Sequence, residues 1–281
     1  MPRLGAHMSI AGSVDQALLR GQQIGCQAIQ IFTKQPNRWA AKPLSPEEIA
    51  RFQETRRATG IAPIIAHDAY LINLASPDPG LWQQSVQAFL TELERCQALE
   101  LPYLVTHAGA HKGAGEQEGL KRIVQALDIV CERLAQVAIL LETTAGQGGS
   151  LCYDFAHIAW IIEQSHFPER LGVCFDTCHV FAAGYELRTR EGYEETFRRL
   201  DAAVGLERVR AFHLNDSKKG WGSRVDRHAH IGQGQLGLEP FRFLLNDPRF
   251  RDHPMVLETP KGPEMEEDRM NLDILRGLLE D

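Results

Sequence analysis

The chain has 281 residues, and its 37 Asp and Glu side chains outnumber its 30 Lys and Arg side chains, which gives a formal charge of −7. This acidic balance disfavours loose binding to nucleic acid or anionic membranes. A content of 43% hydrophobic and 24% charged residues excludes a disordered chain. No apolar run approaches the roughly 18 residues that span a bilayer, and the first residues lack a secretory signal. We therefore expect a cytoplasmic protein without a membrane partner.

Short apolar runs alternate with longer amphipathic stretches along the chain, which is typical of repeated βα units and a parallel sheet. We expect strands at 4–7, 28–32, 61–67, 103–107, 138–142, 172–176, 209–213 and 255–258. A helix start is explicit at Ser45-Pro46-Glu47-Glu48, which offers a capping box with proline at the first helical position. Further helices are expected near 81–99, 116–135, 154–165, 192–204 and 264–279.

Eight βα units within about 250 residues predict a (β/α)8 TIM barrel, an α/β fold. An open doubly wound sheet would show the same alternation, so the prediction depends on the count of eight. No linker or low-complexity tract divides the chain, and we expect a single domain over residues 1–281. The six cysteines follow no paired spacing, which suits reduced, buried thiols and excludes a Cys-x-x-Cys zinc site.

Most expected strands end in a side chain that can bind a metal. The third to eighth strands close with His67, His107, Glu142, Asp176, His213 and Glu258. In a TIM barrel the active site lies at this end of the strands. A lone histidine at a strand end is more often structural than a ligand. Six consecutive ends change this interpretation, because burying six polar groups at one rim is costly unless they are paired or metal-bound.

Two further segments extend this set. His179 follows closely on Asp176, and Asp226 and His228 are two residues apart, so in an extended segment both point the same way. The result is nine candidate ligands, five histidines and four carboxylates. Since one ion takes three or four protein ligands, the nine imply two or three ions with a bridging carboxylate. Imidazole and carboxylate without thiolate favour zinc or manganese, and the share of histidine favours zinc.

Clustered divalent ions with open positions suit hydrolysis of a phosphodiester. They bind phosphate oxygens, lower the pKa of a bound water and stabilise the leaving oxygen, so a separate general base is not needed. The sequence agrees with this chemistry, because it has no Gly-x-Ser-x-Gly elbow and no obvious Ser/His/Asp or Cys/His nucleophile arrangement.

Longer motifs occur in a fixed order along nearly the whole chain. They are 5–9 (GAHMS), 32–34 (FTK), 67–74 (HDAYLINL), 107–111 (HAGAH), 142–148 (ETTAGQG), 172–179 (GVCFDTCH), 181–185 (FAAGY), 213–216 (HLND), 222–228 (GSRVDRH) and 257–259 (LET). Through these motifs the chain closely resembles the endonuclease IV family of apurinic/apyrimidinic (AP) endonucleases, also called deoxyribonuclease IV.

The resemblance implies a TIM barrel with three zinc ions, with manganese as a partial substitute. One ion would be held by His67, His107 and Glu142. Glu142 would bridge to a second ion, bound also by Asp176, His213 and Glu258. The third would be held by His179, Asp226 and His228. These are the nine residues reached from spacing, and among them we expect Glu142, Glu258 and Asp176 to act in catalysis, at the metal-held water and phosphate.

The resemblance also implies a substrate, double-stranded DNA containing abasic sites, and a monomer. The family cuts the backbone 5′ to such a site, leaving a 3′-hydroxyl and a 5′-deoxyribose phosphate, and removes 3′-blocking groups. A missing base lowers the cost of flipping the sugar out of the duplex. We expect loops at the same rim to contact DNA through Lys34, Asn37, Arg38, Trp39, Tyr70, Lys218, Lys219, Arg224 and Arg227. Trp39 and Tyr70 have ordinary rim packing as an equal alternative.

The remaining histidines complete no ligand spacing. We expect structural or supporting roles for His7, His111 and His230, and surface positions for His157, His166 and His253.

Two other functions compete with the nuclease. A sugar isomerase or epimerase would share the barrel and a metal site at strands five to eight, but it leaves His67, His107 and the Asp226/His228 pair unexplained. A non-catalytic binder of damaged DNA would use zinc only structurally, whereas the ligand set here is complete.

Overall fold

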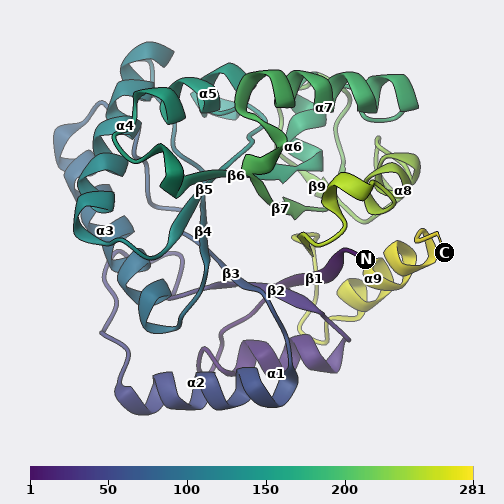
Figure 1. Cartoon of the computed structure of the whole chain (residues 1–281), viewed down its shortest axis with the longest axis horizontal. Coiled ribbons are helices and arrows are strands. Elements are labelled where there is room, and N and C mark those ends of the chain that lie inside the picture. The colour runs from purple at the N-terminus through teal and green to yellow at the C-terminus, as the bar shows by residue number, and fades with distance from the viewer. Residues whose placement is uncertain (281) are drawn as a thin grey trace.

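Eight parallel strands close into a barrel in the computed structural model, which describes residues 1–280 (Figure 1). Their spatial order is β1-β10-β7-β6-β5-β4-β3-β2. The strands are β1 (Arg3–Met8), β2 (Ala28–Phe32), β3 (Ile64–His67), β4 (Tyr103–Thr106), β5 (Ala138–Glu142), β6 (Leu171–Asp176), β7 (Val209–His213) and β10 (Pro254–Leu257). The predicted TIM barrel is confirmed, and the open sheet is excluded.

Helices surround the barrel (Figure 1). They are α1 (Gln16–Gln23), α2 (Pro46–Thr59), α3 (Pro79–Ala98), α4 (Glu116–Arg133), α5 (Phe155–Gln164), α6 (Thr177–Ala183), α7 (Arg190–Val204), α8 (Glu239–Leu245) and α9 (Glu266–Gly277). The predicted capping box is present, because Ser45 Oγ accepts from the Glu48 amide at 3.2 Å and Glu48 Oε2 accepts from the Ser45 amide at 2.8 Å. Helices α1, α6 and α8 were not predicted, because their seven or eight residues are too few to show a clear helical period.

The floor of the barrel explains why the predicted ligands converge. Six inward-facing residues form a separate hydrophobic cluster inside the strands, namely Ile65, Val105, Leu140, Cys174, Ala211 and Val256. Each of them lies two positions before a residue predicted at a strand end. Because side chains of a strand alternate with a period of two, the residue two positions later faces the same way. The predicted ligands therefore rise from this floor into the mouth of the barrel.

Three predicted strand ends differ from the structure by one residue, and the first of them is β1, which continues to Met8. β4 ends at Thr106 and β10 ends at Leu257, so His107 and Glu258 directly follow their strands. The register still aligns the rim, since Asp176 of β6 pairs with His213 of β7, and Phe32 of β2 pairs with His67 of β3.

Buried thiols and a mixed surface complete the description of residues 1–280. All six cysteines are buried and unpaired, as expected of reduced thiols. None of the helices in this range has both the length and the apolar character needed to cross a membrane.

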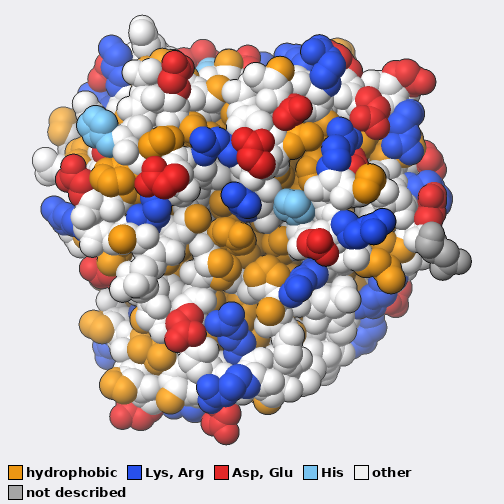
Figure 2. Space-filling view, viewed as in Figure 1, with side chains coloured by type: hydrophobic (Ala, Val, Ile, Leu, Met, Phe, Trp, Pro, Cys, Tyr) orange, Lys and Arg blue, Asp and Glu red, His pale blue; other side chains and the backbone are white. Residues whose placement is uncertain are grey.

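Figure 2 shows acidic and basic side chains intermixed around a central hollow lined by hydrophobic side chains, so this face does not gather the net negative charge into one acidic patch.

Candidate metal centre

The nine predicted ligands converge at the carboxyl ends of the strands in three groups. Within each group the potential ligand atoms lie within 4.8 Å of one another. The groups are His67, His107 and Glu142; Glu142, Asp176, His213 and Glu258; and His179, Asp226 and His228. These are the groups that the sequence analysis assigned to three ions, and metal binding itself stays a prediction.

Glu142 lies where the groups meet. Its Oε2 is 3.0 Å from His67 Nε2 and 3.1 Å from His107 Nε2, and its Oε1 is 3.0 Å from His213 Nδ1. Burial would raise the pKa of Glu142, but the charges of His107 and His213 hold it well below its ordinary value. Glu142 is therefore ionised, and its two oxygens face different histidine groups, as a bridging ligand requires.

The histidine rings are oriented by oxygen atoms outside the three groups. In four rings, one nitrogen faces the other predicted ligands and the second nitrogen donates a hydrogen bond to an oxygen. The donors and acceptors are His67 Nδ1 to the Asp68 carbonyl (2.9 Å), His179 Nδ1 to the Thr143 carbonyl (2.9 Å), His228 Nδ1 to the Glu258 carbonyl (3.1 Å) and His213 Nε2 to Gln30 Oε1 (2.8 Å). In the neutral ring that binds a metal, a donor bond of this kind fixes the proton on one nitrogen and leaves the opposite nitrogen with a lone pair for the ion. The chemistry of the site therefore fits a group of divalent cations.

The carboxylates are held in place by backbone and amide donors. Asp176 caps α6 by accepting from the His179 amide at 2.8 Å, and its Oδ2 accepts from Asn215 Nδ2 at 2.7 Å. Asn215 also accepts from the Glu258 amide at 2.9 Å. One buried asparagine thus orients predicted ligands from two strands, and no role was predicted for it beyond its place in the motif 213–216.

Gln30 is a further residue of the site that the sequence analysis missed. It is fully buried on β2, where it pairs in register with His7 of β1 and Ile65 of β3 and so faces the barrel interior. Its amide nitrogen donates to Glu258 Oε1 at 2.5 Å and lies 3.0 Å from His7 Nδ1. A polar residue in the middle of an apolar strand was the signal that could have identified it. The same contact gives His7 the supporting role expected of it.

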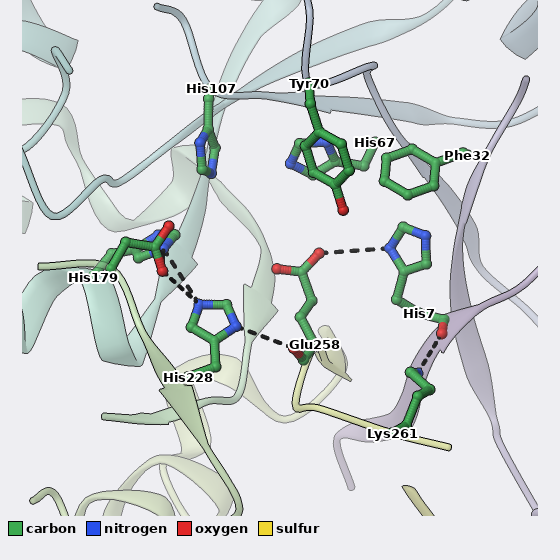
Figure 3. A pocket seen from close by; sticks show the side chains of 10 residues that line it. His7, Phe32, His67, Tyr70, His107, His179, His228, Glu258 and Lys261 are labelled. Atoms are coloured by element: carbon green, nitrogen blue, oxygen red, sulfur yellow. Dashed lines mark hydrogen bonds and ion pairs between the residues drawn. The ribbon is translucent and has the colours of Figure 1, made fainter. Parts of the chain in front are cut away.

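A cavity of about 320 Å³ opens over these groups. Figure 3 shows its histidines and Glu258 facing one another, with the rings of Phe32 and Tyr70 at one side and Lys261 at the edge. Tyr70 is 75% exposed, and its ring centroid lies 5.2 Å from that of Phe32. The cavity therefore combines metal-binding groups with an aromatic wall that is open to solvent.

The other predicted DNA contacts occupy different environments. Asn37, Arg38, Lys218, Lys219 and Arg227 are exposed, whereas Trp39 packs partly against the core. Arg224 is exposed but stacked, with its guanidinium carbon 3.8 Å from the centre of the Tyr153 ring.

Lys34 does not suit the DNA contact predicted for it. It is 5% exposed, its ammonium lies 3.2 Å from the buried carboxylate of Glu92, and it donates to the Arg38 carbonyl at 2.6 Å. No local pattern could indicate this pairing, because Glu92 lies 58 positions further along the chain, on α3.

One surface expectation for the remaining histidines was wrong. His157 is buried on α5, where its ring packs edge-on against Tyr153 and its Nε2 lies 3.5 Å from Glu116. His166 is exposed, as predicted. His111 accepts backbone hydrogen bonds from Gly113 and Gly115, which is a structural role.

The chain is similar to known proteins over nearly its whole length. A family model described as a xylose isomerase-like TIM barrel matches residues 19–277. A protein of Chloroflexus aurantiacus named "Probable endonuclease 4" is 56% identical, covering 100% of this chain and 99% of its own length. One of the same name from Geobacter sulfurreducens is 52% identical, covering 98% of this chain and 94% of its own length. This chain belongs to the endonuclease IV family.

The solved structures agree with this assignment. Endonuclease IV from Thermus thermophilus superposes with a TM-score of 0.87 at 39% identity, covering 99% of this chain and 98% of its own. D-Psicose 3-epimerase from Clostridium cellulolyticum reaches a TM-score of 0.71, covering 99% of this chain and 100% of its own, but at 14% identity this likeness shows only the fold. Membership in the endonuclease IV family makes the chain a nuclease of a metal-dependent family, and the resemblance inferred from the motifs is confirmed.

Proposed function

We propose that this endonuclease IV family member is a zinc-dependent AP endonuclease of base excision repair. It hydrolyses the phosphodiester 5′ to an abasic site in duplex DNA, leaving a 3′-hydroxyl and a 5′-deoxyribose phosphate, and it removes 3′-blocking groups. The observation that carries this proposal is the convergence of nine ligands in three groups around the ionised, fully buried Glu142.

The donor set supports three zinc ions per chain, since each of the three predicted groups contains imidazole and carboxylate donors, and these three share only Glu142. The structure also brings Cys178 close to Asp176 and His228, which already belong to two of these groups. Once bound, such ions supply a nucleophilic hydroxide and stabilise charge on the phosphate. Glu142, Asp176 and Glu258 hold the positions around the reacting phosphate, while the bonds from Gln30 and Asn215 keep these carboxylates and rings from turning away.

The remaining cavity residues suit selection of an abasic nucleotide. Tyr70 offers an exposed ring at the mouth, where it can stack on a base next to the lesion. A baseless sugar is cheaper to extrude than a paired nucleotide, and a narrow cavity rejects one that still carries its base. Arg38, Lys218 and Arg227 are exposed cations available for the flanking phosphates.

The test is cleavage of a duplex oligonucleotide that carries one tetrahydrofuran abasic analogue. Metal-loaded protein should cut on the 5′ side of the analogue and leave the undamaged duplex intact. Binding of the damaged duplex without any cleavage would overturn the enzymatic role and support a damage-binding protein. Mapping both product ends checks the proposed 3′-hydroxyl and 5′-deoxyribose phosphate.

Elemental analysis separates the nuclease from the isomerase alternative. The nuclease should retain about three zinc ions per chain, whereas sugar isomerisation needs only one or two ions to polarise its substrate. The His67/His107 and Asp226/His228 pairs have no task in such a sugar site. Size-exclusion chromatography of the same sample should show the monomer that we propose.

A further inference from the structure

The third group of ligands draws on the loop that leads into β9 (His228–Ala229), a short strand that pairs with β8 (Asp216–Ser217). His179 belongs to α6, whereas Asp226 and His228 come from the segment after β7. His179 Nε2 lies 3.2 Å from Asp226 Oδ1, and His228 Nε2 lies 3.3 Å from the same oxygen. His228 is held by the β8–β9 pairing and by its bond to the Glu258 carbonyl, whereas Asp226 precedes β9 and depends on other contacts to keep its carboxylate against α6.

The main chain provides one part of this attachment. The amides of Gly222 and Arg224 donate to the carbonyls of Phe181 and Ala182, near the end of α6, at 3.1 Å and 2.9 Å. Arg224 itself has a φ of +56°, a left-handed conformation that is uncommon for a residue with a side chain. The chain therefore turns sharply at Arg224, just before Asp226.

Side chains tie this turn to the segment after β5. The Arg224 guanidinium lies 3.8 Å above the ring of Tyr153, and Gln147 Oε1 accepts from the Asp226 amide at 2.9 Å. Gly146 makes room for the stack, since a Cβ there would lie 2.6 Å from an Arg224 nitrogen and 3.0 Å from the Tyr153 ring. Tyr153 is fixed in turn by a hydrogen bond from its hydroxyl to Glu116 on α4.

We propose that Arg224, Tyr153 and Gln147 form a latch that positions Asp226 beside His179 and His228 for the third metal ion. Arg224 is then a positioning residue, and it does not serve as the phosphate contact that its charge suggests. The Arg224 guanidinium is already stacked on an aromatic face. The guanidinium of Arg227, which is also exposed, makes one hydrogen bond within residues 1–280, to the Asp226 carbonyl. This proposal rests on the three-ion centre of the proposed function.

The experiment compares Arg224→Ala with Arg227→Ala, which removes the same charge three residues away. Each variant is equilibrated with a zinc chelator of graded strength, and the retained zinc is counted. Loss of an outer contact typically weakens metal binding by about 10–100-fold. Arg224→Ala should therefore release one ion per chain at a chelator concentration where wild type and Arg227→Ala keep all three. Equal retention in both variants would overturn the latch.

Variants of Tyr153 distinguish a stacking role of Arg224 from a role of its charge in binding phosphate. Tyr153→Leu removes the aromatic face and should reproduce the zinc loss of Arg224→Ala, whereas Tyr153→Phe keeps the ring and should retain the ion. If Arg224 instead contacts phosphate, Tyr153→Leu will keep its zinc, and Arg224→Ala will match Arg227→Ala in weaker, less salt-dependent binding to an abasic duplex.

Amide hydrogen exchange of the metal-free protein tests whether the latch orders residues 222–228 when no metal is bound. Peptides covering 222–228 should exchange faster in Arg224→Ala and Tyr153→Leu than in wild type, while α2 stays unchanged as a control for folding. Unaltered exchange in this loop would overturn the proposal. If wild type bound fewer than three ions, the proposed zinc count would fail, and the exchange result alone would decide on the latch.

Discussion

Gln30 orients the ring of His213. Its Oε1 accepts a hydrogen bond from His213 Nε2 at 2.8 Å, and both side chains are fully buried. The bond leaves His213 Nδ1 facing Glu142 Oε1 at 3.0 Å and Glu258 Oε2 at 3.3 Å. A residue of β2 therefore determines how a predicted ligand on β7 presents its lone pair.

Replacing Gln30 with Met should weaken the second group of ligands. The change keeps the volume of the side chain but removes its hydrogen bonds to His213 and Glu258, so we expect about a 10–100-fold loss of zinc affinity at that position. Chelator competition measures the loss. Gln53→Met on α2 is the matched control, because Gln53 bonds only the Leu99 carbonyl, far from the rim. Unchanged zinc retention in Gln30→Met would show that the ring keeps its orientation without Gln30.

Glu142→Gln should reduce cleavage of the abasic duplex by at least about 100-fold, because a neutral amide cannot bridge two cations as a carboxylate does. Steady-state turnover with excess zinc provides the measurement. Glu132→Gln makes the same chemical change at an exposed position of α4 and should leave turnover unaltered. Near-normal turnover of Glu142→Gln would mean that the ligand assignment is wrong.

Lys34→Met should destabilise the fold. It leaves Glu92, which is 1% exposed, without its cationic partner, and breaking a buried pair in this way costs about 3 kcal/mol in the free energy of unfolding. Urea denaturation at neutral pH measures this cost. Adding Glu92→Gln to the same chain should recover much of it, because the remaining side chain then carries no charge. A variant of normal stability that binds DNA weakly would restore Lys34 as a DNA contact.

The same variant should show a defined pH dependence. Burial raises the pKa of Glu92, and Lys34 opposes this shift. Without Lys34 the folded protein favours the protonated carboxyl more strongly, so stability is kept at low pH and is lost as the pH rises through the raised pKa. The deficit of Lys34→Met relative to wild type should thus shrink on acidification. A deficit that stays constant with pH would contradict an uncompensated charge at Glu92.

Tyr70→Ala should weaken binding of the abasic duplex by about tenfold, the usual cost of losing one stacked base contact. Tyr70 is exposed and holds none of the predicted ligands, so turnover at saturating substrate should change far less than KM. Tyr70→Phe keeps the ring and should bind nearly as wild type. Equal KM values for the alanine variant and wild type would show that Tyr70 does not contact DNA and only packs against its neighbours at the rim.

The sequence predicted the fold well where the signal was local. Strand and helix periods depend on neighbouring residues, and the eight strand ends were predicted to within about one residue of their observed positions. Two of the unpredicted helices, α6 and α8, have seven residues each. Their formation depends on capping and packing, as in the cap that Asp176 makes for α6.

The sequence by itself determined that six of the nine residues approach one another, because a period of two along each strand and repeated βα units send these side chains to one rim. His179, Asp226 and His228 lie beyond the barrel strands, and the structure decided how they join the other six. Only the tertiary structure decided what surrounds them. Gln30 orients a ring from a strand far away in the chain, Lys34 turns inward to Glu92, and Arg224 lies on Tyr153. The loops lack a repeating pattern, so the direction of a loop side chain depends on the distant segment that packs against it.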